Sequence, residues 1–240
     1  MIPEVVILCG GYGTRVRQIS KKLPKALLPI NQKPFLYWVL KNLENQGVKK
    51  VFLCIGYKGY LIKSFVKKNQ NNFNLKIICS SENSKNLLGT GGAIKKILKK
   101  LNSYFYIMQG DTFLFMNLKK MLLSFQKKKK PILMMVYKNF DKKHKNNIIL
   151  GKNYLHYDKN IFKNRMKYID YGVMLVKKNI FFKTNKIFQI SDLLKKQSLL
   201  KHVAFLKAKD KFLEIGSLHG YRETIKNFKK IYNEIYKIIS

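Results

Sequence analysis

The first half of the chain alternates between short apolar runs and longer amphipathic stretches. The runs are rich in Val, Ile, Leu and Phe, whereas apolar residues in the longer stretches recur at helical spacing. This alternation predicts an α/β fold: a Rossmann-like, mostly parallel mixed sheet flanked by helices on both faces. We expect strands at 4–9, 51–55, 75–79, 104–108 and 132–137, and helices at 35–46, 60–68, 92–101 and 118–127.

The second half is less regular. Residues 138–167 are polar and rich in Lys and Asn. Apolar residues near the C-terminus recur at helical spacing, which predicts one final helix at about 218–239. No internal repeat or linker divides the chain, so we expect one domain over 1–240. Strands in this half are expected at 148–150, 154–157 and 168–176.

A glycine-rich turn follows the first expected strand. The apolar run 5–9 leads directly into Gly10-Gly11-Tyr12-Gly13-Thr14-Arg15, and Pro24-Lys25 comes soon after. Glycines at a strand end let backbone N–H groups converge on an anion, because no side chain blocks the approach. Two fixed cations close to such a turn suit a triphosphate.

Two common glycine-loop motifs do not fit this turn. The chain has no Gly-x-x-x-x-Gly-Lys-Ser/Thr run, which excludes a P-loop. A dinucleotide fingerprint would need a third glycine where Val16 stands. It would also need an acidic residue after the second strand, which instead ends in Gly56-Tyr57-Lys58. The pattern therefore argues against NAD binding.

The net charge is extreme. Lys and Arg number 49 against 12 Asp and Glu, which gives a formal charge of +37 over 240 residues. Such a field would attract nucleic acid. The lysines are dispersed, however, and only residues 127–130 form a block. We interpret the charge as compositional drift and expect no specific nucleic-acid partner, although binding through charge stays open as an alternative.

Cysteine usage and hydropathy predict the compartment. Cys9, Cys54 and Cys79 form no Cys-x-x-Cys pair, and each lies in an apolar run. This placement is typical of small buried hydrophobic residues in a reducing environment. No apolar run approaches the length of a membrane span, and no signal-like leader is evident. We expect a cytoplasmic protein without membrane association.

The glycine turn with Pro24-Lys25 resembles the signature of the sugar-1-phosphate nucleotidyltransferases, Gly-Gly-x-Gly-Thr-Arg followed by Pro-Lys. Further segments resemble motifs of that family in the expected order, so the likeness covers nearly the whole chain. They are residues 25–30 with Lys33-Pro34, residues 88–93, Gly110-Asp111 and residues 214–217. Within the family, the chain looks most like the heptose 1-phosphate and mannose 1-phosphate guanylyltransferases.

The resemblance implies a fold and a division of labour. The fold would be that of nucleotidyltransferases, which is GT-A-like, with a small β-rich part that binds the acceptor. Residues 1–137 would form the nucleotide-binding half, 138–217 the acceptor-binding part and 218–240 a C-terminal helix. The likeness is also compatible with a homo-oligomer.

The resemblance also assigns roles around the triphosphate. Arg15 would contact the β- and γ-phosphates, because its guanidinium offers forked donors. Lys25 would be the catalytic lysine near the α-phosphate. The second glycine loop, with Gly89 and Thr90, would meet the base. The remaining expected nucleotide contacts are Leu8, Gly10, Gly11, Gly13, Thr14 and Gly110.

Two carboxylates are expected to bind Mg²⁺. Asp111 follows a strand, and ligands of open α/β sheets bind beyond the carboxyl ends of the strands. Its alternative role is to cap the next helix, but that helix is expected only from Leu118. Glu214 stands where the family usually has Asp. We expect it to complete the site, with two alternatives open: coordination through water, or hydrogen bonds to its own turn only.

The acceptor side rests on a looser resemblance. Lys159 looks like the family lysine that binds the sugar phosphate. Asp170 and Gly172 occupy the place of an Asn-x-Gly segment that hydrogen-bonds sugar hydroxyls. A carboxylate there can still accept bonds from hydroxyl groups, but it would repel an acidic acceptor.

The resemblance therefore implies a Mg²⁺-dependent enzyme that transfers a nucleotide from an NTP, GTP being favoured, to a sugar 1-phosphate. The product would be an NDP-sugar for surface polysaccharide or glycoconjugate synthesis, and pyrophosphate would leave. One alternative is a cytidylyl- or uridylyltransferase acting on a sugar or another phosphorylated acceptor. Another is a catalytically inactive regulatory homologue, which Glu214 and Asp170 would favour as departures from the family pattern.

Overall fold

The structure is a computed structural model that describes residues 1–16, 19, 21–83, 86–140, 144–160 and 164–236. The chain divides into two compact units. Unit 1 comprises Met1–Leu87, Met108–Phe115 and Phe212–Ser240, and unit 2 comprises Leu88–Ile107 and Met116–Lys211. The chain thus returns to unit 1 twice, each time next to a residue expected in the active site. The expected functional division at 137 and 217 stays a prediction.

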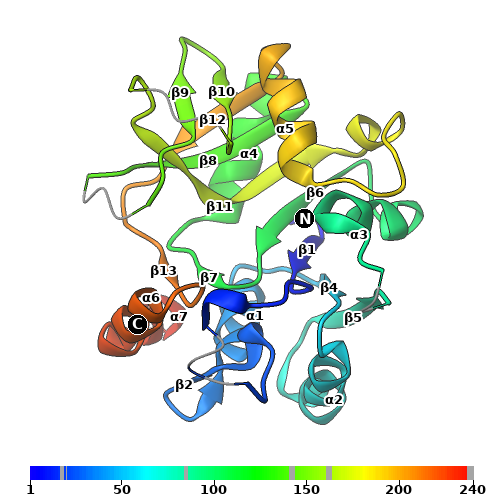
Figure 1. The fold of residues 1–240 in the computed structure, drawn as a ribbon, viewed down its shortest axis with the longest axis vertical. Coiled ribbons are helices and arrows are strands. Elements are labelled where there is room, and N and C mark those ends of the chain that lie inside the picture. Colours follow the sequence, from blue (N-terminus) through cyan, green and yellow to red (C-terminus); the bar gives the residue numbers. More distant parts are fainter. Residues whose placement is uncertain (17–18, 20, 84–85, 141–143, 161–163, 237–240) are drawn as a thin grey trace. The chain divides into compact units, whose positions relative to one another are not determined.

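Unit 1 is built on parallel strands (Figure 1). β1 (Val5–Leu8), β4 (Lys50–Ile55) and β5 (Lys76–Ser81) lie side by side in that order. Leu8 pairs with Cys54, and Cys54 with Ser80, so the three carboxyl ends lie level. Two helices connect these strands, α1 (Phe35–Asn45) and α2 (Gly59–Asn69). These elements confirm the α/β pattern expected for the first part of the chain.

Short elements shape the edge of unit 1. The 3-10 turns η1 (Thr14–Val16) and η2 (Lys25–Leu27) follow β1. β2 (Pro29–Ile30) pairs with β3 (Lys33–Pro34) just before α1. β7 (Thr112–Phe113) pairs antiparallel with β13 (Leu213–Glu214), which sets Glu214 opposite Thr112. None of these short strands was predicted from the apolar pattern.

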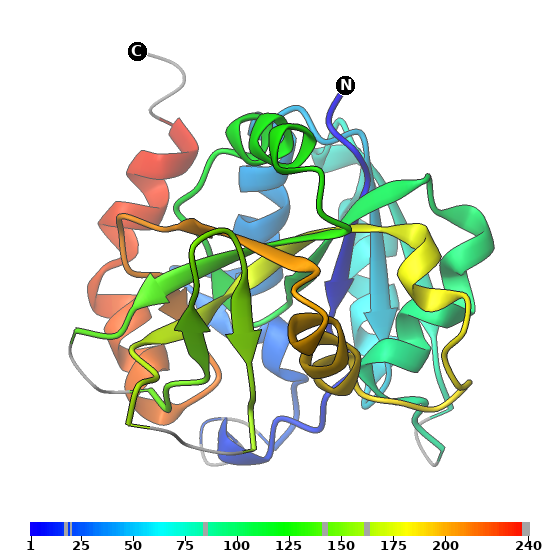
Figure 2. The same cartoon turned by 90° about the horizontal axis from the view of Figure 1, so that it is seen from above.

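The C-terminal segment forms two helices, so the prediction of one helix was wrong. α6 (Leu218–Lys226) and α7 (Phe228–Tyr236) are separated at Asn227, and both are seen in orange and red in Figure 2. The Asn227 backbone N–H makes the helical i to i−4 bond to the carbonyl of Glu223, and the Asn227 side chain donates to the same oxygen. The break lets Phe228 pack on Trp38 of α1, with ring centroids 4.9 Å apart. The last expected helical residues, 237–239, lie outside the described part of the chain.

Unit 2 has a mixed sheet. β8 (Ile132–Lys138) pairs antiparallel with β11 (Tyr168–Lys177) and parallel with β12 (Val203–Lys207). The hairpin of β9 (Ile148–Leu150) and β10 (Leu155–Tyr157) adjoins β11 and is the yellow-green pair of arrows in Figure 2. These strands confirm the β-rich segment expected after residue 137.

Three helices are described in unit 2. α3 (Gly89–Ile97) starts earlier than expected and continues as the 3-10 turn η4 (Leu98–Lys100). α4 (Leu118–Lys128) begins where predicted, with Asn117 as its cap. α5 (Ile190–Leu199) and the strand after it were not predicted. β6 (Tyr104–Gln109) leads the chain from unit 2 into unit 1.

Two of the three cysteines are buried, as expected from the sequence. Cys9 and Cys54 are buried, Cys79 is partly buried, and none forms a disulfide. Burial raises the pKa of the Cys9 thiol, which keeps it neutral. Among the described residues, no helix combines the length and apolar character needed to cross a bilayer.

Candidate active site

The glycine turn begins at the end of β1, and there its backbone is in close contact with the end of β4. Cys9 donates its N–H to the carbonyl of Cys54 at 2.8 Å. A Cβ atom on Gly56 would lie 2.8 Å from the Gly10 oxygen, so the two backbones meet where no side chain fits. Gly13 has a φ of +62°, a conformation that side-chain-bearing residues rarely adopt. The turn then ends in η1, with Val16 buried and Arg15 exposed.

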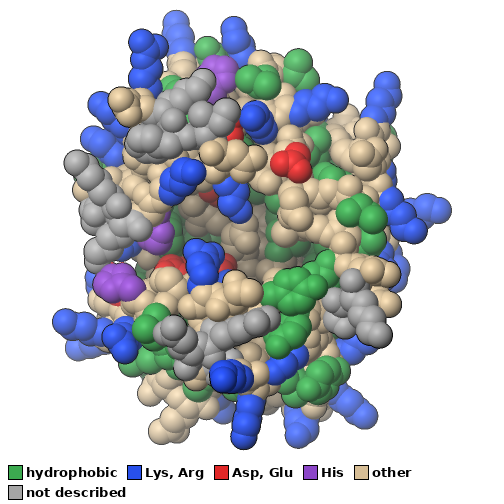
Figure 3. All heavy atoms as spheres, in the orientation of Figure 1, with side chains coloured by type: hydrophobic (Ala, Val, Ile, Leu, Met, Phe, Trp, Pro, Cys, Tyr) green, Lys and Arg blue, Asp and Glu red, His purple; other side chains and the backbone are tan. Residues whose placement is uncertain are grey.

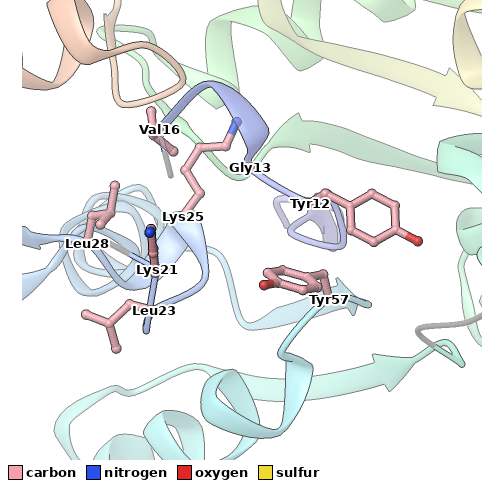
Figure 4. Close-up of a pocket in the computed structure, with 8 residues that line it drawn as sticks. All are labelled: Tyr12, Gly13, Val16, Lys21, Leu23, Lys25, Leu28 and Tyr57. Carbon is pink, nitrogen blue, oxygen red and sulfur yellow. The ribbon is translucent and has the colours of Figure 1, made fainter. Parts of the chain in front are cut away.

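A pocket of about 300 Å³ lies beside this turn. Figure 4 shows the rings of Tyr12 and Tyr57 on one side and Lys25 and Leu28 on the other. Of the residues predicted from the sequence, Gly13 and Lys25 line it. The other lining residues are Tyr12, Val16, Lys21, Leu23, Leu28 and Tyr57.

Lys25 connects the glycine turn with Asp111. It begins η2 directly after Pro24, and its stem lies 3.5 Å from the point where Gly13 would carry a Cβ. Its Nζ donates to Asp111 Oδ2 at 2.6 Å, and the two side chains are 19% and 25% exposed. A partly buried, charge-assisted bond of this length fixes the ammonium more firmly than a surface ion pair would.

Asp111 reaches this position because Gly110 allows the end of β6 to approach β1. A Cβ on Gly110 would lie 2.5 Å from the Cys9 sulfur and 2.7 Å from the Leu8 oxygen. The Gly110 N–H instead donates to Leu8 at 3.0 Å. Asp111 is not a helix cap, since Asn117 caps α4. The glycine turn, Lys25 and the Asp111 carboxylate therefore lie next to one another in the structure, as expected.

Glu214 and Asp111 both border Gly216. A Cβ on Gly216 would be 2.8 Å from Glu214 Oε2 and 2.9 Å from Asp111 Oδ2, so both oxygens border the same point. The Glu214 carboxylate accepts from the N–H groups of Gly216 and Ser217 and from the Ser217 hydroxyl. Glu214 thus hydrogen-bonds its own turn at the N-terminus of α6.

The two carboxylates offer the oxygen ligands that Mg²⁺ prefers. In the described residues, no group of three or more His, Cys, Asp or Glu side chains could hold a metal ion. An ion between Asp111 and Glu214 would therefore take further ligands from phosphate oxygens and water, as Mg²⁺ usually does. The residues fit a cation that arrives with a nucleotide.

The second glycine loop has a packing role in unit 2. A Cβ on Gly91 would lie 2.2 Å from the Phe188 ring, and one on Gly89 2.5 Å from the Phe188 carbonyl oxygen. Thr90 donates its hydroxyl to Gln189 at 3.0 Å and accepts from the Ile190 N–H. These contacts join the start of α3 to the start of α5. Contact of Gly89 and Thr90 with a base stays a prediction.

The predicted acceptor residues come together in unit 2. Asp170 lies where the pairing of β11 with β8 is irregular, and its carboxylate accepts from the Gly172 N–H at 2.8 Å. Gly172 has a φ of +96°. Burial raises the pKa of Asp170 to about 6, although the Gly172 N–H and the charge of Lys159 oppose the shift. Lys159 and Asp170 therefore act on each other electrostatically.

Sequence reasoning missed the aromatic and cationic lining of the pocket. Tyr57 and Lys58 were seen only as a strand ending that lacks an acidic residue. The signal was present, because the end of β4 is level with the end of β1 in any parallel sheet of this order. Lys21 and Leu23 carry no such signal, since residues 21–24 belong to no helix or strand.

These features define a class. A glycine turn after the first parallel strand, with a lysine–aspartate pair beside it, is typical of α/β proteins that bind phosphorylated ligands at the carboxyl ends of their strands. A model of the nucleotidyl transferase family matches residues 4–147. The chain belongs to the nucleotidyl transferase family, as the sequence motifs indicated.

One curated relative matches nearly the whole chain, and another matches about half of it. A D-glycero-alpha-D-manno-heptose 1-phosphate guanylyltransferase from Campylobacter jejuni is 33% identical over 220 residues, or 91% of this chain and 96% of that protein. One of the same name from Aneurinibacillus thermoaerophilus is 37% identical over 119 residues, 49% of this chain and 50% of its own.

Solved structures agree. HddC from Yersinia pseudotuberculosis matches with a TM-score of 0.79 and 28% identity, covering 94% of this chain and 99% of that one. The same protein complexed with GMP-PN matches with a TM-score of 0.75. The inositol-1-phosphate CTP transferase from T. maritima, 18% identical over 99% of this chain and 96% of that one, has a TM-score of 0.78 and so shares the fold. The predicted fold class is confirmed.

Proposed function

We propose that this chain is a sugar-1-phosphate guanylyltransferase. A phosphate oxygen of the sugar 1-phosphate attacks the α-phosphorus of GTP, the bond to the β-phosphate breaks, and pyrophosphate leaves. The observation that carries the proposal is the joint position of the glycine turn, Lys25 and Asp111 in a chain related over 91% of its length to a heptose 1-phosphate guanylyltransferase.

The protein has little covalent work to do in such a transfer, and its task is to hold two anions and offset their charge. Backbone N–H groups of the glycine turn would hold the phosphates, with Lys25 at the α-phosphate. The exposed Arg15 would reach the β- and γ-phosphates. The other nucleotide contacts would come from Leu8, Gly10, Gly11, Gly13, Thr14, Gly89, Thr90 and Gly110.

Asp111 and Glu214 would hold the metal ion, which we propose is Mg²⁺. When bound, it would neutralise charge on the transferring phosphate. The ion would compete with the Lys25 ammonium for the Asp111 carboxylate, and with the backbone N–H groups of the turn for Glu214. Lys25 would then be available to the phosphate. Lys159 would bind the acceptor phosphate, with Asp170 and Gly172 at the sugar hydroxyls.

A matrix assay tests the proposal. The protein is incubated with Mg²⁺, each of the four NTPs and a panel of sugar 1-phosphates, and pyrophosphate release is followed. Turnover of GTP with a neutral heptose or hexose 1-phosphate is the expected result. Turnover with CTP or UTP instead would show that the nucleotide donor is not GTP, while the protein would still be a sugar-1-phosphate nucleotidyltransferase. No release across the whole panel would favour an inactive homologue and overturn the proposal.

A further inference from the structure

The segment 56–58, between β4 and α2, makes contacts that the proposed reaction does not use. Because Leu8 pairs with Cys54, Gly10 and Gly56 stand level at the ends of neighbouring strands. The residues of this segment contact three places in the chain between β1 and Lys25: Gly10, Tyr12 and the carbonyls of residues 21 and 22. We call residues 56–58 the support segment.

Gly56 and the Tyr57 backbone hold the first residue of the glycine turn. A Cβ on Gly56 would approach the Gly10 oxygen to 2.8 Å and the Gly10 Cα to 3.3 Å. The Tyr57 N–H donates to that same Gly10 oxygen at 3.2 Å. Two backbones therefore meet without any flexible side chain between them, and a shift of one must move the other.

The Tyr57 ring holds the middle of the turn. Its centroid lies 5.5 Å from that of Tyr12, with the ring planes tilted by 50°. Both rings line the pocket beside the turn (Figure 4). This is a normal separation for an attractive aromatic pair. Tyr12 lies between Gly11 and Gly13, two of the proposed phosphate contacts, so the pair restrains the backbone on both sides of it.

Lys58 holds the segment that leads to Lys25. It adopts a left-handed backbone, with φ of 50°, directly before α2. Its ammonium donates to the carbonyl oxygens of Lys21 and Lys22. Many lysines of this chain extend into solvent, as the scattered blue side chains of Figure 3 show. Lys58 instead connects α2 with the residues just before Pro24-Lys25.

We propose that the support segment is a positioning element of the phosphate site: it fixes the glycine turn and the approach to Lys25 as one preformed cradle. Only the expected effect on the KM for the NTP rests on the proposed function; the positioning of the turn does not. Lys25 transmits the effect, because its stem packs on Gly13 and its ammonium bonds Asp111. Loss of the support should weaken the use of the NTP and spare the sugar phosphate.

The first experiment compares Lys58→Met with Lys67→Met. Methionine keeps an apolar stem and removes the donors. Lys67 is an exposed residue of α2, the helix that follows Lys58. We expect Lys58→Met to raise the KM for the NTP about tenfold, since misplacement by an ångström can cost a hundredfold. The KM for the sugar phosphate and the melting temperature should stay at wild-type values. Lys58→Arg, which keeps the donors, should recover part of the loss.

The second experiment needs no turnover. Amide hydrogen exchange is measured on the free protein, with attention to residues 10–16 and 21–28. Lys58→Met should speed exchange at 21–28, and Gly56→Ala should speed it at 10–16, while Lys67→Met matches the wild type. Unchanged exchange and unchanged KM would overturn the inference, as would faster exchange spread over the whole chain. If the wild-type protein showed no turnover, the proposed function would be wrong. The exchange measurement would still show whether the support segment positions the phosphate site.

Discussion

The ammonium of Lys25 and the carboxylate of Asp111 lie 2.6 Å apart although 86 positions separate them in sequence. The two groups, each expected to meet an opposite charge of the substrate complex, neutralise each other here. A divalent cation at Asp111 and a phosphate at Lys25 would replace one ion pair with two. On the roles proposed above, the pair would couple metal binding to release of the Lys25 ammonium.

Removing the Asp111 charge should abolish turnover and leave the fold intact. Asp111→Asn keeps the shape of the side chain but cannot offer a negative ligand to a metal ion. We expect kcat to fall by about a thousandfold, the scale of losing a preorganised electrostatic group. The cost in the free energy of unfolding should be about 1 kcal/mol, as for a partly exposed ion pair. Pyrophosphate release and thermal melting measure the two effects, and near-normal rates would refute the metal assignment.

Removing the Lys25 charge should tighten metal binding to the free protein. Lys25→Gln relieves Asp111 of its partner, so a divalent cation no longer competes with the ammonium. We expect Mn²⁺, used as a probe without nucleotide, to bind several-fold more tightly, while turnover is lost. Titration followed by electron paramagnetic resonance measures the free ion. The matched control is Lys67→Gln, which should bind Mn²⁺ as the wild type does; equal affinity in all three proteins would contradict the coupling.

Arg15→Lys should weaken NTP use without affecting stability. The side chain is exposed, so its contribution to the fold is small. An ammonium keeps the charge but cannot form the paired bonds of a guanidinium to phosphate oxygens. We expect the KM for the NTP to rise about tenfold, on the scale of one lost charge-assisted bond. Steady-state kinetics with varied NTP give the answer, and unchanged constants would place Arg15 away from the triphosphate.

Asp170 should make stability depend on pH. Burial raises its pKa to about 6, above the ordinary value of 3.8. Between these two pH values the folded chain therefore keeps a proton that the unfolded chain has already released. Stability should therefore decrease as pH rises from about 4 to 6, and the penalty is complete above that range. Asp170→Asn removes the titration.

Urea unfolding of both proteins between about pH 4 and 7.5 measures this difference. The free energy of unfolding of the variant should rise relative to that of the wild type as pH rises. The difference should reach a few kcal/mol at most, as expected from a pKa shift of this size. The Gly172 N–H can still donate to the amide oxygen of the substituted side chain, so the comparison changes charge more than geometry. A gap that does not vary with pH would show that the Asp170 carboxyl is not held in its neutral form.

The sequence predicted the parts of the site that depend on local order. The glycine turn, Pro24-Lys25 and Gly110-Asp111 each follow a strand or precede a turn, so short motifs identify them. Tyr57 and Lys58 were missed because their partners lie about 36 to 45 positions earlier in the chain. The need for glycine at Gly91 was likewise invisible, since it comes from the ring of Phe188.

The fold was predictable where apolar runs are long and separated. The longer strands of the first half were found for that reason. α5 was missed because its apolar residues follow a polar, irregular segment and no strong start signal precedes Ile190. The final helix was drawn too long because the apolar spacing continues across Asn227. α6 ends at Asn227 all the same, and Phe228 then packs on Trp38 of α1, a contact that spacing along the chain does not report.

The pairing of β13 with β7 has a consequence for protein synthesis. A nascent chain that has just passed β12 already holds the glycine turn, Lys25 and Asp111, but not Glu214 or the strand that covers Thr112. With the proposed metal site, competence would therefore arrive late, after the parallel strands of unit 1 have left the ribosome. Proteolytic cleavage ahead of Leu213 would separate Glu214 from that unit together with α7, whose Phe228 packs on Trp38.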